Sequence, residues 1–341
     1  MNTIYSALIA PMQRTRVDVF ENIFVVFLGL GTLVGIVVVA YTLYNAYKYR
    51  DTGEAAEKDE DLPSVGELPT GGKGGKKLFL SFGISAIIVI SLVIWTYTML
   101  LYVEDPGDAN QEEALNVEVT GDSFAWYFEY DNGIESTSRL RVPADERVWL
   151  QVTSGDVWHA FGIPDQKVKA DAIPGEYDET WFEAEEPGTY EIKCFELCGE
   201  FHTSMTGEVQ VMEPDAYDEW MNEQLTMSIT VQDGNETPVS EETGYGDVGY
   251  EMSLESQEWD FEETYTDDQF DNGTITVSNV SDIEQGGVYN ITISPTEGGQ
   301  QFEPVEEQFD MTGPVDESYT LDLNATESET NESDTNDGGE A

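Results

Sequence analysis

Two long apolar stretches near the N-terminus dominate the hydropathy pattern. Residues 23–46 and 78–103 contain no Asp, Glu, Lys or Arg. Each exceeds the roughly 20 residues that cross about 30 Å of hydrocarbon as a helix. The pattern therefore predicts two transmembrane helices joined by residues 47–77. A secretory signal is the alternative for the first stretch, but its apolar run is long and its basic flank is weak.

The basic residues predict the orientation of this helix pair. Six of the 14 Lys and Arg residues lie in residues 47–77, whereas only Arg14 and Arg16 precede the first stretch. The segment after the second stretch begins with the acidic run EDPGDANQEE. Positive charge is retained on the cytoplasmic side of a membrane. We therefore expect residues 47–77 on the cytoplasmic side of the cell membrane. Residues 1–22 and the chain from residue 104 onward are expected on its outer side.

Beyond the second stretch, the apolar positions change to a period of two. Residues 113–212 contain runs such as LNVEVTG, RVWLQVTS and GEVQVME, separated by turn sequences such as DNG and EEPG. This pattern is typical of an antiparallel β-sandwich or barrel. A short closing helix is expected in residues 214–225. The predicted fold class is a membrane-anchored all-β protein, with an outer domain over residues 104–225.

Residues 226–341 form a third region, which contains no Lys or Arg. Short strand-like runs such as GTITVSNV and VYNITIS predict a small additional β-domain. The low-complexity end, NATESETNESDTNDGGEA, predicts a solvated, disordered tail. Nothing in these residues indicates a function for the acidic extension.

The charge balance argues against nucleic acid as a partner and suggests a solvent of high salt concentration. Lys and Arg total 14 and Asp and Glu total 69, which gives a net charge of −55. Such a polyanion is not expected to bind nucleic acid phosphates. Its self-repulsion is tolerable where salt reduces the screening length to about 3 Å, as at about 1 M. We therefore predict a halophilic source; an acidic disordered tail is the alternative, but carboxylates are also dense in the middle of the chain.

All of the cysteine and histidine residues lie in or near one motif. The stretch CFELCGEFHTSM contains Cys194, Cys198, His202 and Met205, and His159 lies upstream in DVWHAFGIP. A disulfide between the cysteines is one interpretation, since an outside location favours it. However, so short a ring would stabilise the fold little, and the histidines would remain unexplained.

A metal site explains more of this motif. Two cysteines and two histidines are a common zinc set, but the pairs lack the long insert of a zinc finger, and zinc gives Met205 no role. Thiolate, imidazole and thioether ligands together favour copper. A blue mononuclear centre uses one cysteine, whereas a second thiolate could bridge two coppers that each bind one histidine. A closed, soft site of this kind is suited to electron transfer.

The chain resembles subunit II of the haem–copper cytochrome oxidases over roughly residues 20–224. The resemblance rests on the two apolar stretches, VWHAFGIPDQKVKADAIPGEYDE and CFELCGEFHTSM. It implies an outer cupredoxin-like Greek-key sandwich that carries a dinuclear copper A centre. By this resemblance Cys194 and Cys198 are the bridging thiolates, His159 and His202 are the imidazole ligands, and Met205 is the thioether ligand.

The resemblance also assigns roles to three further residues. Glu196 would donate its backbone carbonyl to one copper and its carboxylate to a magnesium ion at the subunit I interface; otherwise it is one exposed glutamate among many. At the position of Phe124 the family often has a tryptophan that receives electrons from cytochrome c. A phenylalanine at this position makes the chain resemble a divergent, ba3-like branch of the family. Electron transfer would then use Phe124, Trp126 or the rim of the His202 loop, unless these aromatics are simply strand core.

The implied function is that of an electron-accepting subunit. The chain has no C-x-x-C-H motif and no spare histidine for a haem or a second copper site, so oxygen reduction is expected in subunit I. The expected donor is an external cytochrome c or a small blue-copper protein. The alternatives are the copper A subunit of a nitric oxide reductase and a membrane-anchored copper carrier or assembly protein.

Overall fold

The computed structural model describes residues 15–48, 50, 73–104, 111, 114–278 and 283–323. Most of the predicted inner loop 47–77 and the predicted tail after residue 323 lie outside the described residues. The chain divides into two compact units, Met1–Glu112 and Glu113–Ala341.

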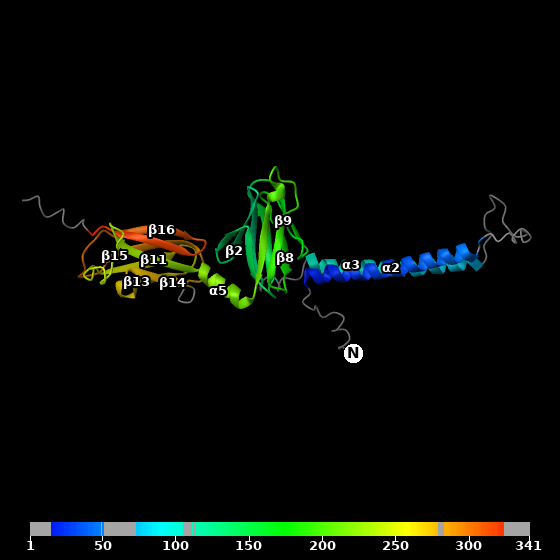
Figure 1. Ribbon diagram of the computed structural model, residues 1–341, viewed down its shortest axis with the longest axis horizontal. Coiled ribbons are helices and arrows are strands. Elements are labelled where there is room, and N and C mark those ends of the chain that lie inside the picture. Colours follow the sequence, from blue (N-terminus) through cyan, green and yellow to red (C-terminus); the bar gives the residue numbers. More distant parts are fainter. Residues whose placement is uncertain are drawn as a thin grey trace, which may run out of the picture. The chain divides into compact units, whose positions relative to one another are not determined.

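The first unit contains the two apolar helices, α2 (Arg16–Lys48) and α3 (Lys73–Glu104), which lie against each other (Figure 1). Each is longer than its apolar stretch because the helix continues into polar flanks. Thr15 and Asp18 cap α2 reciprocally: the backbone N–H of Asp18 donates to Thr15 Oγ1 at 3.2 Å, and that of Thr15 donates to Asp18 Oδ2 at 3.1 Å. Both helices are long and apolar enough to cross a membrane. Their large apolar side chains, such as Phe24 and Val93, are exposed within the unit, as lipid-facing side chains would be.

The second unit begins with a two-sheet sandwich. One sheet has the order β3-β2-β1-β5-β8, and the other has the order β4-β10-β9-β6-β7. The strands of the first sheet are β1 (Leu115–Asp122), β2 (Ala125–Tyr130), β3 (Glu135–Thr137), β5 (Arg147–Ser154) and β8 (Asp178–Glu183). Those of the second are β4 (Arg139–Pro143), β6 (His159–Ile163), β7 (Val168–Ala172), β9 (Gly188–Cys194) and β10 (Thr206–Met212), and the short helix η3 (His202–Ser204) precedes β10.

Alternating apolar residues explain how these sheets pack. Val117 and Val119 of β1 point inward beside Leu150 of β5, which runs parallel to β1. β2 pairs antiparallel with β1 and buries Trp126 and Phe128 in the same core. β1 and β2 therefore present every second residue to the space between the sheets. Helix α5 (Pro214–Gln224) follows β10 and buries its Tyr217 and Trp220 side chains.

A second sandwich occupies the described part of the C-terminal region. Its sheets have the orders β14-β11-β17 and β13-β12-β15-β16. Its elements are β11 (Thr226–Asp233), β12 (Tyr250–Ser256), β13 (Glu262–Thr266), η4 (Asp267–Gln269), β14 (Thr274–Ser278), β15 (Gly287–Pro295), β16 (Val305–Met311) and β17 (Val315–Leu321). Apolar residues alternate here too, so that Ile229 of β11, Met252 of β12 and Ile291 of β15 are buried.

The buried Tyr130 phenol predicts how the first sandwich responds to alkali. Its hydroxyl donates to the carbonyl of Arg141 at 2.8 Å and accepts from the Arg141 N–H at 2.9 Å. Burial raises the pKa of Tyr130 to about 12. An unfolded tyrosine has a pKa of about 10, so the folded state holds this proton more tightly. The contribution of this raised pKa to the free energy of unfolding is on the order of 2 kcal/mol. It is fully present below pH 10 and is lost as the pH rises to about 12.

We therefore expect the unfolding free energy of the chain to fall between pH 10 and 12, and the Tyr130→Phe variant to fall less steeply. Chemical denaturation at fixed salt, followed at several pH values, measures this difference. Tyr127→Phe is the matched control, because the Tyr127 side chain is exposed. Parallel curves for the parent and Tyr130→Phe would contradict the assignment.

Candidate metal centre

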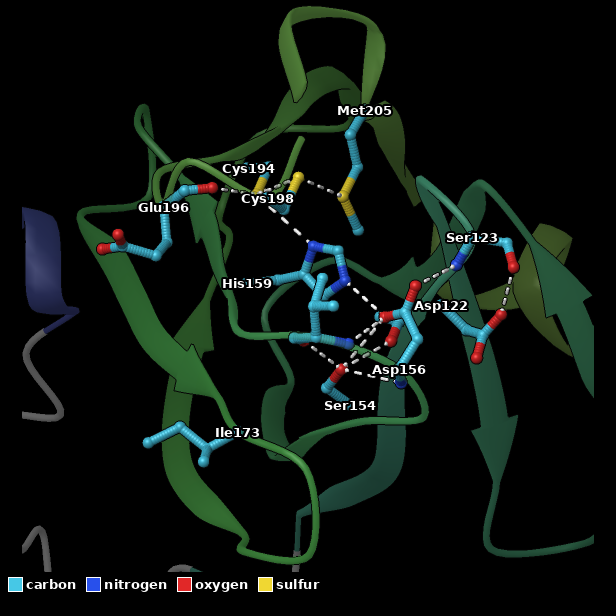
Figure 2. Close-up of polar contacts among 12 residues, drawn as sticks. Asp122, Ser123, Ser154, Asp156, His159, Ile173, Cys194, Glu196, Cys198 and Met205 are labelled. Atoms are coloured by element: carbon cyan, nitrogen blue, oxygen red, sulfur yellow. Dashed lines mark hydrogen bonds and ion pairs between the residues drawn. The ribbon is translucent and has the colours of Figure 1, made fainter. Parts of the chain in front are cut away.

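His159 opens β6 and is completely buried. Its two ring nitrogens face different groups (Figure 2). Nε2 lies 2.8 Å from Oδ1 of Asp156, and Nδ1 lies 3.9 Å from Sγ of Cys194. The imidazole therefore connects a carboxylate to a sulfur atom.

The two cysteines come from one loop whose ends are fixed by backbone hydrogen bonds. The N–H of Cys194 donates to the Met205 carbonyl at 3.1 Å, and the N–H of Phe195 donates to the Ala160 carbonyl at 2.8 Å. Cys194 and Cys198 are free thiols with a Sγ–Sγ distance of 3.9 Å. A disulfide requires about 2.05 Å. The structure thus brings the cysteines together without a covalent bond.

The remaining two members of the motif lie beside Cys198. Nδ1 of His202 is 3.6 Å from Cys198 Sγ. Sδ of Met205 is 3.9 Å from the same sulfur (Figure 2). His202 is half-buried in η3, whereas Met205 is only 1% exposed. All five sequence-predicted side chains therefore gather around the two sulfur atoms.

The donor atoms fit a shared soft metal. Those of His159, Cys194 and Cys198 all lie within 4.8 Å of one another. Two thiolates bound tetrahedrally to one metal at about 2.3 Å are about 3.8 Å apart. The observed sulfur separation of 3.9 Å is close to this value. Thiolate, imidazole and thioether donors are the set that favours copper among the first-row metals.

Burial, together with the neighbouring Cys194, raises the pKa of the Cys198 thiol to about 11. Without a metal this thiol is protonated at neutral pH. Because the thiolate is the form that binds metals, metal binding has to displace this proton.

Glu196 presents two different groups. Its carbonyl oxygen accepts a hydrogen bond from Cys194 Sγ at 3.2 Å, so the carbonyl faces the sulfur atoms. Its side chain is exposed and points away from them in Figure 2. One residue can therefore offer a carbonyl to this centre and a carboxylate to a neighbouring site.

The two aromatic candidates lie at different depths. The Trp126 ring is fully buried and packs edge-to-face on His159, with centroids 6.0 Å apart. Among the described residues, its indole N–H has no hydrogen-bond partner. Phe124 is half-buried in the β1–β2 turn and packs edge-to-face on Phe201 at 5.5 Å. A docking protein can touch Phe124 but cannot touch Trp126.

Sequence reasoning missed Asp156, the carboxylate behind His159. Its residue type did not distinguish it from the other 68 acidic residues. The only available signal was its position three residues before His159.

Apolar exposure also concentrates around the centre. Within residues 114–323 the described structure has seven exposed large apolar side chains, and five of them lie in the loops that contain Asp156 and Cys198. These five, which we call the apolar rim, are Val157, Trp158, Phe195, Leu197 and Phe201. Several large apolar side chains exposed in the two loops of one site, on so acidic a protein, point to an interaction surface.

Comparison with known proteins identifies the family. The heme-copper oxidase subunit 2 of Aeropyrum pernix is 36% identical over 225 residues, which cover 60% of this chain and 94% of that relative. The chain belongs to the subunit II family of haem–copper oxidases. The profile described as "Cytochrome C oxidase subunit II, periplasmic domain" matches residues 126–212.

Two further relatives of this subunit II chain are bacterial. Cytochrome c oxidase subunit 2 of Alkalihalophilus pseudofirmus is 31% identical over 209 residues, which cover 60% of this chain and 57% of that protein. The solved periplasmic domain of subunit II of Bradyrhizobium japonicum is 33% identical, with a TM-score of 0.31, and the match covers 31% of this chain and 89% of that domain.

The family match confirms the predicted fold class: two apolar helices followed by a cupredoxin-like β-sandwich. A subunit II sandwich with clustered His159, Cys194 and Cys198 also indicates copper A as the cofactor.

Proposed function

We propose that this chain is the electron-accepting subunit of a terminal respiratory oxidase. It receives electrons from an external donor at a dinuclear copper A centre and delivers them to a haem–copper subunit I, where oxygen is reduced. The supporting observation is that one imidazole, a second thiol and a thioether lie around the Cys198 thiol, with a second imidazole beside Cys194. The family membership supports the same function.

Each ligand residue has a distinct task in this proposal. Cys194 and Cys198 would bridge the metals, and His159 and His202 would each bind one of them. Met205 and the Glu196 carbonyl would complete the two coordination shells. The centre, when loaded, stores and releases one electron. The chain holds the donors from β6, β9 and the loop before β10, so little rearrangement is needed when the charge changes.

The setting of the centre follows from the same proposal. Helices α2 and α3 would anchor the chain in the cell membrane, with residues 47–77 inside and the sandwich outside. The charge of −55 supports operation in concentrated salt, where long-range attraction between proteins is screened. We therefore propose that the donor, a cytochrome c or small blue-copper protein, binds the apolar rim through apolar contact.

The decisive experiment uses the full chain in detergent and high salt, loaded with copper. We expect two coppers per chain and an electron paramagnetic resonance spectrum of one electron shared equally between them. Cys198→Ser should lose both features, because a hydroxyl does not replace a bridging thiolate. One copper per chain, or a preference for zinc, would contradict the dinuclear centre and favour a copper carrier.

Met205→Leu should retain both coppers and raise the reduction potential, because a hydrocarbon no longer donates to the oxidised form. The exchange conserves volume, so the fold should lose less than about 1.5 kcal/mol. Potentiometric titration measures the shift. Met212→Leu, at the end of β10, is the control and should leave the potential unchanged. If Met205→Leu also left it unchanged, Met205 would be core only.

We also propose that the Glu196 carboxylate binds magnesium at the interface with subunit I. Its exposure and its direction away from the sulfur atoms support this role, and Mg²⁺ is often held by one or two carboxylates. In the assembled oxidase, Glu196→Gln should lower the bound magnesium or substituted manganese while the copper signal remains. Glu200→Gln, exposed in the same loop, is the control. Unchanged manganese affinity in Glu196→Gln would refute this role.

A further inference from the structure

The carboxylate of Asp156 links two parts of the first sandwich. Its Oδ1 lies 2.8 Å from Nε2 of His159 and accepts the Val157 N–H at 2.6 Å. Its Oδ2 accepts the N–H of Ser123 at 3.1 Å (Figure 2). One side chain therefore contacts a proposed copper ligand and the β1–β2 turn.

Backbone contacts fix the loop that carries Asp156. The buried hydroxyl of Ser154 donates to the carbonyl of Gly121 at 3.0 Å, and the N–H of Gly155 donates to the same oxygen at 3.0 Å. A Cβ at Gly155 would lie 2.5 Å from Oδ2 of Asp122, so glycine allows this side chain to lie close against the loop. The β5–β6 loop is thus held closely against the β1–β2 turn.

The turn itself has an unusual backbone. Ser123 and Phe124 have φ values of +50° and +63°, and the flanking residues Asp122 and Ala125 pair across the hairpin. Two-residue turns with positive φ at both centres favour Asn-Gly, because other side chains are strained there. Ser123 has compensating bonds: its N–H to Asp156 and its hydroxyl to Oδ1 of Asp122 at 2.6 Å.

The strained turn places Phe124 against the other ligand segment. The Phe124 ring packs on Phe201, which directly precedes His202. A Cβ at Gly199 would lie 3.3 Å from the same ring, so glycine allows this close approach next to Cys198. The turn therefore touches the segments of both histidines, one through Asp156 and the other through Phe124.

From this geometry we infer that Asp156 is a positioning residue for the copper centre. It holds the proton of His159 on Nε2, which leaves the electron pair of Nδ1 directed toward Cys194, and it locks this imidazole to the Phe124 turn. Histidine ligands commonly donate their second N–H to such a carboxylate, which fixes the tautomer and increases ligand basicity. The inference rests on the proposed role of His159 as a copper ligand.

The test compares Asp156→Asn, Asp156→Ala and the parent as full chains. Loss of such a partner lowers metal affinity by about 10- to 100-fold. We expect Asp156→Ala to bind copper in this range below the parent, with a higher reduction potential because a less basic imidazole stabilises the oxidised centre less. Asp156→Asn keeps an acceptor without the charge and should lie between the two. Asp165→Asn, an exposed acid at the other end of β6, makes the same charge change and should match the parent.

A metal-free measurement separates this inference from the proposed function. Nitrogen-15 resonances of the His159 ring in the copper-free parent should show the proton on Nε2, and Asp156→Ala should shift the population toward the other tautomer. A parent that carries the proton on Nδ1 would overturn the inference, even if the copper centre forms. So would Asp156 variants that equal the parent in copper affinity, potential and tautomer. A parent with the Nε2 tautomer but no dinuclear copper would refute the proposed function and leave the tautomer assignment supported.

Discussion

The loop between β9 and β10 keeps its shape because a backbone hydrogen bond closes it. The N–H of Cys194 donates to the Met205 carbonyl at 3.1 Å, so the two ends of the loop meet where the neighbouring strands β9 and β10 end and begin. Every donor atom of the motif except His159 lies on this closed segment. The centre therefore depends on strand pairing for its geometry, and a rigid scaffold is what an electron-transfer site requires.

The two histidines occupy contrasting environments. His159 is completely buried between a carboxylate and a sulfur atom, whereas His202 is half-buried in a short helix beside Phe201. One side of the centre is thus held from within the sandwich, and the other lies near the surface. The apolar rim lies in the loops next to the two histidines, on a protein whose net charge is −55. Partner contact at that surface would depend little on charge in concentrated salt.

Backbone strain and positioning coincide at the β1–β2 turn. Ser123 and Phe124 adopt positive φ values that glycine would adopt without strain. The turn is held because Asp156 accepts the Ser123 N–H and the Phe124 ring packs on Phe201 in the loop before β10. Residues held in such conformations often cluster at functional sites, where the surrounding structure stabilises them.

The helices, the strands and the chemistry of the donor atoms could be predicted from the sequence. Uninterrupted apolar runs predicted α2 and α3, strict alternation predicted the sandwich, and a chain with only two cysteines and two histidines left little choice of ligands. The neighbours of these donor atoms became visible only in the folded chain. Trp126 is buried and packs against His159. Asp156 is one of 69 acidic residues in the sequence, and only the fold shows that its carboxylate contacts the His159 imidazole. Periodicity and composition describe local preferences, whereas the Nε2–carboxylate and Nδ1–sulfur contacts arise from the packing of segments up to 35 positions apart.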